Sequence, residues 1–474
     1  MALVDLVLKD AKIVTGDGIF VGGLAIDSGQ IVAIARNGNL PEADKVQDLH
    51  GNLIMPGAID GHCHVHAMGR SDWEDFTTGT MAAAAGGITT ILEMPQTLPP
   101  TSTAKAFAEK RKEAERDAVV NFGLYGGAGS QNLEEIPRIA AEGAVAFKTF
   151  MSQPSPGREK DMWGLFVTDD GSFFEVFKTI APTGIPSCVH AENWQIYQYL
   201  SKKLESEGKM DLAAYLEARP GITESEGISR AAMLANAAGA RIHICHVCAQ
   251  EAVDVVRRAK ANGQRLTAET CPHYVTFTAE QVNQYGAYAK INPPIRTVQD
   301  HNELWKGLND GTIDIVTSDH GPFTKDWKEA GRDNIWKASM GTPSLDAFLP
   351  VMLTHVNRGQ ISLQTLVRIV SENVAKIFGI YPRKGTIQVG SDADLVVVDM
   401  KKRKKLNLNE FYTKAKEIAL VYNGVEVEGM PVATFVNGVE VMRDGQVTGK
   451  PGTGTFLKPD LTGISMNSNL TGRF

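Results

Sequence analysis

The middle of the chain, from about residue 56 to residue 380, alternates short apolar runs with longer helical stretches, and this alternation most constrains the fold. The helical stretches include 103–118, 131–142, 194–218, 223–238 and 249–261. The predicted strands are the run before His62 and the segments 89–94, 121–125, 144–148, 185–190, 241–246, 265–270 and 313–319. Eight βα units predict an α/β fold of the (β/α)8 TIM barrel type, whose catalytic groups lie at the carboxyl ends of the strands.

Both ends of the chain differ from this middle. Residues 1–55 and 383–445 contain short strand-like runs separated by turn-forming glycines, and the two segments predict one small β-sandwich domain formed from both termini. The barrel would then occupy residues 56–382. Residues 446–474 are rich in Gly, Pro, Asn and Thr, and we expect an irregular C-terminal tail that is ordered by packing on a neighbouring subunit.

Composition and charge are those of a globular enzyme. The chain of 474 residues is 43% hydrophobic and 22% charged, and its net charge of −7 argues against nucleic acid or an anionic membrane as a partner. Its five cysteines lie mostly in apolar runs without the dense spacing of a secreted disulfide framework, which indicates reduced thiols. Neither a signal peptide nor an apolar run of membrane-spanning length is evident, so a cytoplasmic location is expected.

The segment that ends in His62-Cys63-His64-Val65-His66 has the spacing of metal ligands. In an extended chain the side-chain period is two, so His62 and His64 project from the same face with ring nitrogens that can converge on one point. A lone histidine is more often a hydrogen-bonded structural residue. Here the pair ends an apolar strand after a Pro-Gly turn, and this position favours the metal-binding interpretation.

The rule that catalytic groups lie at the carboxyl ends of barrel strands, here called the strand-end rule, selects further residues. Later strands end in Lys148, His190, His246 and Asp319. Buried lysines are rare, and Lys148 has two interpretations: it reaches solvent or a carboxylate, or it is carbamylated by carbon dioxide and bridges two metal ions. Four imidazoles, one carboxylate and one carbamate form a ligand set suited to two zinc ions.

Together these residues resemble the amidohydrolase superfamily, and within it the cyclic amidohydrolases, which are the hydantoinases or dihydropyrimidinases, allantoinases and dihydroorotases. The resemblance spans residues 3–445 and includes 55–64, 83–90, 147–148, 190–193, 243–247, 269–274, 292–296, 318–320 and 390–395. It implies a (β/α)8 barrel with an appended β-sandwich, a small-molecule cyclic amide substrate, and assembly as a homodimer or homotetramer.

By position, the resemblance assigns His62, His64 and Asp319 to a more buried metal ion and His190 and His246 to a more exposed one. Carboxylated Lys148 would bridge the two ions. The implied mechanism is attack of a metal-bound hydroxide on the ring amide carbon, with Asp319 as the catalytic acid and base.

The sequence constrains the identity of the substrate less than that of the metal ligands. Dihydroorotases are expected to carry an arginine at the position of His66, and Gln96 replaces an expected asparagine, so both residues argue against that alternative. Residues 69–76 resemble allantoinases, whereas 190–193 and 292–294 resemble hydantoinases at least as much. His66, Gln96 and Asn292 are the candidate substrate-binding residues; His66 is alternatively a loop histidine, and Asn292 alternatively stabilises the turn before two prolines.

Two classes of function follow. The first is a binuclear metal-dependent hydrolase that opens a cyclic amide or ureide of the hydantoin, dihydropyrimidine or allantoin type. The second is a non-catalytic scaffold, because relatives of dihydropyrimidinase serve as cytoskeleton-associated proteins after losing metal ligands. All six ligand positions are filled here, which favours the enzyme. A mononuclear deaminase would not need the bridging Lys148.

Overall fold

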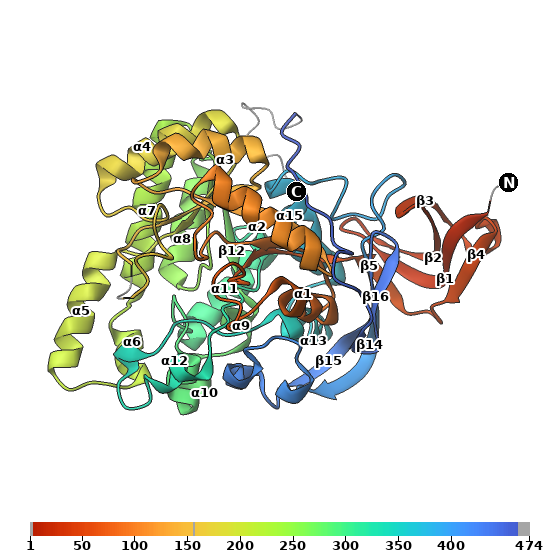
Figure 1. Cartoon of the computed structure of the whole chain (residues 1–474). Coiled ribbons are helices and arrows are strands. Elements are labelled where there is room, and N and C mark those ends of the chain that lie inside the picture. Colours follow the sequence, from red (N-terminus) through yellow and green to blue (C-terminus); the bar gives the residue numbers. More distant parts are fainter. Residues whose placement is uncertain (1–2, 155–156, 463–474) are drawn as a thin grey trace.

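The structure is a computed structural model that describes residues 3–154 and 157–462. Two separate sheets organise these residues. One is an eight-stranded parallel sheet surrounded by helices, and the other is a nine-stranded sheet built from both ends of the chain. Figure 1 shows the helical body with the strands of the N-terminal segment at one end of the molecule. The predicted fold class, a (β/α)8 barrel with a separate β-structure from both termini, is confirmed.

The barrel strands follow one another in chain order around the sheet. They are β6 (Ala58–Cys63), β7 (Ile88–Glu93), β8 (Asn121–Gly127), β9 (Ala146–Phe150), β10 (Ser187–His190), β11 (Ile242–Ile244), β12 (Leu266–Thr270) and β13 (Ile315–Val316). Both faces of β7 and β8 are fully buried, which explains why these strands read as continuous apolar runs without alternation. The first strand meets the segment that follows the last one through a parallel bridge between Cys63 and His320, and this contact closes the barrel.

The barrel strands differ from their predicted ranges by a few residues, and in three of them the difference concerns a candidate site residue. β11 ends at Ile244 and β13 at Val316, because His246 and Asp319 lie in turns where their φ angles are 39° and 43°. β9 continues to Phe150, since its pairing with β10 extends to His190, and Lys148 therefore lies inside this strand and not at its end. All these side chains still reach the same edge of the barrel, as predicted for residues at the carboxyl ends of its strands.

Helices connect and cover the strands. The described α-helices are α1 (Phe76–Ala85), α2 (Ala104–Asp117), α3 (Ile136–Glu142), α4 (Asp170–Ile180), α5 (Trp194–Ser206), α6 (Leu212–Glu217), α7 (Gly221–Ala238), α8 (Gln250–Ala261), α9 (Pro272–Thr276), α10 (Ala279–Val282), α11 (Val298–Asp310), α12 (Lys325–Glu329), α13 (Phe348–Asn357), α14 (Leu363–Val367) and α15 (Asn373–Ile377). Several begin at a side chain that accepts a hydrogen bond from the first turn, such as Asp75, Thr103 and Asn193. No helix within 3–154 and 157–462 is long and apolar enough to cross a membrane.

The second sheet joins segments that lie far apart in sequence. Its strands are β1 (Val4–Val14), β2 (Ile19–Asp27), β3 (Gln30–Ala35), β4 (Ala43–Asp48), β5 (Leu53–Pro56), β14 (Leu395–Lys405), β15 (Glu426–Val436), β16 (Val439–Arg443) and β17 (Gln446–Val447). β5 pairs with β1 on one side and with β14 on the other, so this strand links the two halves. Leu8, Ile26, Leu395 and Phe435 belong to one shared apolar core. Figure 1 shows β14 and β16 alongside β5.

The amino-terminal end of the barrel rests on this sheet through a buried polar cluster. Asn121, the first residue of β8, donates to Asp394 Oδ2 at 2.9 Å, and Lys384 donates to the same carboxylate at 2.5 Å. The tail joins the same place, since Thr455 donates from its backbone nitrogen to Asn121 at 3.0 Å. The described part of the tail thus contacts its own barrel, its packing on a neighbouring subunit stays a prediction, and the remainder of the tail lies outside the described residues.

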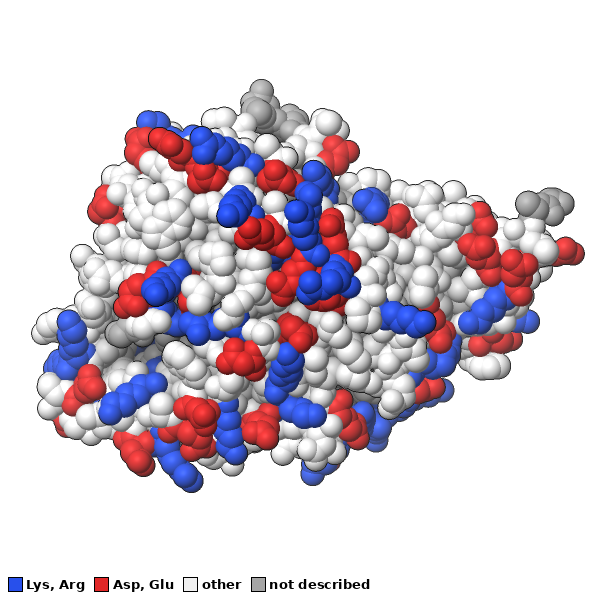
Figure 2. All heavy atoms as spheres, in the orientation of Figure 1, with Lys and Arg blue, Asp and Glu red and all other residues white. Residues whose placement is uncertain are grey.

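Basic and acidic side chains are interspersed over the surface. Figure 2 shows Lys and Arg next to Asp and Glu on most of the visible face. Many of them form short-range pairs on exposed helices, such as Lys178 with Glu175. Such pairs contribute little to the free energy of unfolding.

The Lys384–Asp394 pair predicts a measurable loss of stability. Lys384 is 1% exposed, so Lys384→Met leaves the buried Asp394 carboxylate without its cation, whereas Asp392, which lies 2.9 Å from Lys384, keeps Arg383 as a partner. We expect a loss of about 3–5 kcal/mol in the free energy of unfolding, measured by thermal denaturation. Lys402→Met is the matched control, because the exposed Lys402–Asp444 pair should contribute at most about 1 kcal/mol. Equal denaturation midpoints for the two variants would contradict the structural role of Lys384.

Candidate active site

A cavity of about 540 Å³ opens at the carboxyl ends of the barrel strands. Its lining includes every candidate site residue that the sequence selected: His62, His64, His66, Gln96, Lys148, His190, His246, Asn292 and Asp319. These residues come from segments up to 257 positions apart. The barrel brings them together because its parallel strands all end at one edge.

The first cluster in this cavity contains His62, His64 and Asp319. The Nε2 atoms of the two histidines lie 3.2 and 3.6 Å from Asp319 Oδ1. One ligand atom from each of the three residues lies within 4.8 Å of those of the other two, which is close enough to hold a single metal ion. The period-two spacing of His62 and His64 thus has the expected geometric consequence.

The second cluster contains His190 and His246. His190 Nδ1 and His246 Nε2 face each other at 2.9 Å. Two imidazole nitrogens bound to one tetrahedral zinc ion are separated by about 3.3 Å, so a small rotation of either ring would allow both to bind a single ion. The His62 and His246 rings are 5.5 Å apart, which makes the two clusters neighbours.

Lys148 is close to both clusters of imidazoles. Its side chain is fully buried, and Nζ is 3.0 Å from Cys245 Sγ. After burial, which is the main cause, the positive charge of Lys148 contributes to the lowered pKa values of His62, His64, His190 and His246. One amino group therefore acts electrostatically on all four imidazoles.

The donor set fits a metal ion. Burial lowers the pKa of His62 to about 4 and lowers those of His64 and His246 well below the ordinary value, so these rings are neutral at pH 7. Neutral imidazole is the form that binds metals. His62 Nε2 is buried and has no hydrogen-bond partner among the described residues, although it faces Asp319. A buried lone pair without a partner is costly, and a metal ion would satisfy it.

Two glutamates orient the imidazoles, and sequence reasoning did not select them. His62 Nδ1 hydrogen-bonds Glu269 Oε1 at 2.5 Å, and His243 Nε2 donates to Glu269 Oε2 at 3.0 Å. His190 Nε2 donates to Glu192 Oε2 at 3.0 Å. In His62 and His190 the other nitrogen is left to face the cavity, which is the usual arrangement around a metal-bound histidine, whereas Nδ1 of His243 bonds Thr267. The strand-end rule could have found Glu269, which is the next to last residue of β12.

Glu192 is itself held by a cation. The Arg219 Nη1 donates to Glu192 Oε2 at 2.5 Å, and the Arg219 guanidinium lies 3.9 Å from the centre of the Tyr197 ring. Burial alone would raise the pKa of Glu192, but Arg219 and His190 lower it to about 2. The carboxylate is therefore ionised and fixes the orientation of His190.

The three candidate substrate-binding residues lie on the cavity wall. His66 is buried, and its Nδ1 is 2.9 Å from the backbone oxygen of Gln96. The ring of His66 stacks on that of His64 at 5.4 Å. Asn292 Oδ1 accepts from Tyr215 Oη at 3.3 Å. The structure thus brings His66, Gln96 and Asn292 to the cavity, while their role in binding a substrate stays a prediction.

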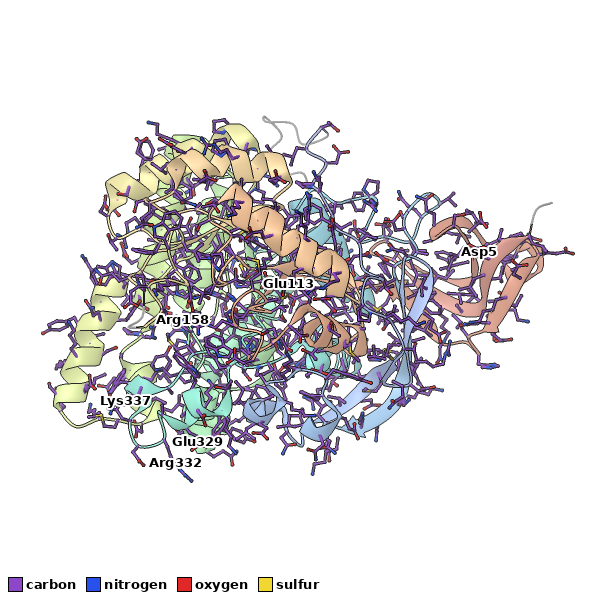
Figure 3. All side chains as sticks on the ribbon, in the orientation of Figure 1. Asp5, Glu113, Arg158, Glu329, Arg332 and Lys337 are labelled. Atoms are coloured by element: carbon purple, nitrogen blue, oxygen red, sulfur yellow. The ribbon has the colours of Figure 1, made fainter. Side chains whose placement is uncertain are left out.

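The remaining wall comes from loops in which no periodic pattern pointed to function. Apolar and aromatic side chains contribute much of it: Phe150, Met162, Phe323, Trp327, Trp336 and Met340. Basic side chains of this wall are Arg158, Arg219, Lys290 and Lys337, and Figure 3 labels Arg158 and Lys337. Sequence reasoning missed these residues because their positions depend on loop conformation.

Comparison with known proteins agrees with this geometry. The model of the amidohydrolase family matches residues 53–441. The chain is 39% identical over 455 residues to an L-hydantoinase from Paenarthrobacter aurescens, covering 96% of this chain and 98% of the relative. It is 34% identical over 458 residues to an allantoinase from Deinococcus radiodurans, covering 96% and 99%.

Solved structures show the same relationship. An L-hydantoinase (dihydropyrimidinase) from Arthrobacter aurescens superposes with a TM-score of 0.92 and 38% identity, covering 96% of this chain and 100% of the other. A D-hydantoinase superposes with a TM-score of 0.89 and 32% identity, covering 96% and 99%. The chain belongs to the amidohydrolase family, within its hydantoinase and allantoinase group. The predicted enzyme class, a cyclic amidohydrolase, is confirmed, and this argues against a non-catalytic scaffold.

The orienting role of Glu269 can be tested by metal affinity. Glu269→Gln keeps the shape of the side chain but removes the charge that holds His62 and His243, so we expect zinc to bind about 10- to 100-fold more weakly. Competition with a chelator measures this affinity. Glu224→Gln is the control, because Glu224 is also a buried carboxylate but bonds Cys248 and Arg296. Equal affinities in the two variants would refute the orienting role.

Proposed function

We propose that this enzyme hydrolyses the ring amide of a hydantoin-type cyclic ureide at a centre that holds two divalent metal ions. The observation that carries the proposal is the convergence of four imidazoles, Asp319 and Lys148 on one cavity at the carboxyl edge of the barrel. The L-hydantoinase and D-hydantoinase relatives support the hydantoin ring. The wider class comprises dihydropyrimidine and allantoin rings as well.

The ligand set divides between two ions. His62, His64 and Asp319 would hold the first ion, and His190 and His246 the second. Lys148, in its carboxylated form, would bridge them. Bound there, two zinc ions or other divalent ions supply Lewis acidity, which polarises an amide carbonyl and lowers the pKa of water towards neutrality.

Charge balance supports carboxylation of Lys148. Four neutral imidazoles and one carboxylate place a single negative charge beside two ions that carry four positive charges. An unmodified ammonium group at Lys148 would add a fifth positive charge in a buried site, where such repulsion is poorly screened. Carboxylation of Nζ replaces this positive charge with a negative one and adds two oxygen ligands.

Asp319 is suited to move the proton of the reaction. Burial raises the pKa of this carboxyl well above its ordinary value, while the Lys148 charge opposes the rise. A carboxylate with a raised pKa accepts a proton readily, so Asp319 would take one from the attacking water and deliver it to the ring nitrogen as the amide bond breaks. His66, Gln96 and Asn292 would hold the ring in position.

The allantoinase-like segment 69–76 does not favour an allantoin ring. Its residues, all of them described, are absent from the cavity lining. Glu74 accepts hydrogen bonds from Thr78 and Thr413, and Asp75 caps α1. These contacts give Glu74 and Asp75 a structural explanation that is independent of the substrate.

A direct test is a ring-opening assay of the zinc-loaded protein with hydantoin, dihydrouracil, allantoin and dihydroorotate, with metal content measured on the same sample. We expect about two metal ions per chain and the highest kcat/KM for hydantoin. Turnover of dihydroorotate or allantoin alone would refute the assignment of the ring. One metal ion per chain in a fully active sample would refute the binuclear centre.

Replacement of Lys148 tests the bridging role. Lys148→Ala should lose metal ions and lower kcat by several orders of magnitude, because both ions lose a shared ligand. Short carboxylic acids such as acetate or propionate should restore part of the activity, since they can occupy the space of the carbamate. Lys160→Ala, at an exposed position of a nearby loop, is the control. Retention of two ions and full turnover in Lys148→Ala would contradict the bridge.

A further inference from the structure

Arg158 occupies an unusual position in the loop between β9 and α4. It is 8% exposed, and its Nε donates to Asp161 Oδ2 at 2.7 Å. Arg70 Nη2 donates to both oxygens of the same carboxylate at 3.2 Å, and Asp161 is 1% exposed. One buried carboxylate therefore serves two guanidinium groups, and the cluster has an excess positive charge.

Aromatic rings hold both guanidinium groups in place. Arg70 and Arg158 lie 4.8 and 5.1 Å from the centre of the Trp73 ring, and Arg158 also lies 5.7 Å from that of Phe323. Such contacts stabilise a cation by interaction with the ring face. They also restrict the rotation of the side chain, so the free end of Arg158 is presented in a defined direction.

The terminal nitrogens of Arg158 have no hydrogen-bond partner among residues 3–154 and 157–462. A guanidinium group carries five N–H donors, and in Arg158 only the Nε donor is used within the described residues. Nη2 is buried and unpaired, and Arg158 is part of the cavity lining. Burial lowers the pKa of Arg158, and Asp161 compensates for only part of this cost. An acceptor inside the cavity would satisfy the unpaired donors.

The other basic side chains of the cavity wall have partners in the protein or are solvated by water. Arg219 is bound to Glu192, and Lys290 donates to the backbone oxygens of Ile335 and Ala338 at 2.7 and 2.8 Å. Lys337 is exposed at the rim, where water solvates it. Asp319 is the one carboxylate among the described residues of the lining, so little opposes the entry of an anion.

Ring contacts connect Arg158 to the imidazoles. The His66 ring packs at 5.4 Å from His64 and at 5.8 Å from Phe323, and Phe323 in turn contacts Arg158. Arg158 and the candidate metal ligands line the same cavity, so a ring held at these ligands can carry a substituent towards the guanidinium. In Figures 2 and 3, which share one orientation, basic atoms lie in a hollow at the place labelled Arg158.

We propose that the cavity recognises cyclic ureides whose ring carries a carboxylate on a short side chain, and that Arg158 binds this carboxylate. The inference rests on the proposed function, because it takes the ring to lie at the imidazole clusters. It assigns Arg158 as a specificity-determining residue, and it narrows the proposed substrates to cyclic ureides that carry a negative charge. Arg70 and Asp161 position Arg158, and Lys337 at the rim attracts the anion.

The test uses two ring-matched substrates. 5-(2-Carboxyethyl)hydantoin and 5-(2-carbamoylethyl)hydantoin have nearly the same shape and differ in charge. We expect the metal-loaded wild-type enzyme to favour the carboxylate by about tenfold or more in kcat/KM, since charge-assisted hydrogen bonds are the stronger ones. Arg158→Gln should lower kcat/KM for the carboxylate by about 10- to 100-fold, mainly through KM, and change that for the carbamoyl compound by less than about twofold.

Two further variants complete the design. Lys160→Gln removes an exposed cation of the same loop and should leave the preference unchanged. Arg158→Lys keeps the charge without the planar pair of donors and should retain part of the preference. Metal content and circular dichroism of each variant establish that the fold is intact. Equal kcat/KM for the two substrates in the wild type, or equal losses for both in Arg158→Gln, would overturn the inference while the proposed ring hydrolysis stands.

A binding experiment separates the two proposals when no hydantoin is opened. Titration calorimetry of the metal-loaded protein with N-carbamoyl-L-glutamate and N-carbamoyl-L-glutamine compares the same pair of side-chain end groups without turnover. Tighter binding of the glutamate compound that disappears in Arg158→Gln supports the inference even though the proposed reaction has failed. Equal binding of both compounds overturns it.

Discussion

The closing contact of the barrel is the interaction on which the site depends. Ser318 donates from its backbone nitrogen to Asp60 Oδ1 at 2.8 Å, and the backbone nitrogen of Asp319 donates to the oxygen of His62 at 2.9 Å. These bonds join the first barrel strand to the segment that follows the last one. Asp60 is fully removed from water, and this burial raises its pKa to about 7. Without this closing contact, Asp319 would not face His62 and His64.

Around this closing contact, buried charge is arranged in pairs that orient other groups. Glu269 holds His62 and His243, Arg219 holds Glu192, and Glu192 holds His190. The backbone contributes as well, since His66, His246 and Asp319 adopt positive φ angles that cost about 1–3 kcal/mol each. The surrounding barrel stabilises these conformations, and as a result ring nitrogens and carboxylate oxygens converge on a small volume.

The sequence could predict a large part of this arrangement. His62, His64, His190, His246 and Asp319 were found from strand patterns, because parallel strands of a barrel end at one edge and the side-chain period of a strand is two. Lys148 was found by the same rule although β9 extends to Phe150. Exact strand ends were less accessible: His246 and Asp319 lie in turns beyond β11 and β13, and turn conformation depends on neighbours that are remote in sequence.

By itself, then, the sequence determined the barrel, the β-structure from both termini and the chemical types of the residues at the strand ends, because local periodicity and residue chemistry are properties of short segments. Only the tertiary structure decided which charges pair. Glu269 meets two histidines, and Asp161 is shared between Arg70 and Arg158, while Nη2 of Arg158 has no partner in the part of the chain that the structure describes. Such pairing depends on which remote segments of the chain come within contact distance of one another, and closure of the barrel decides this.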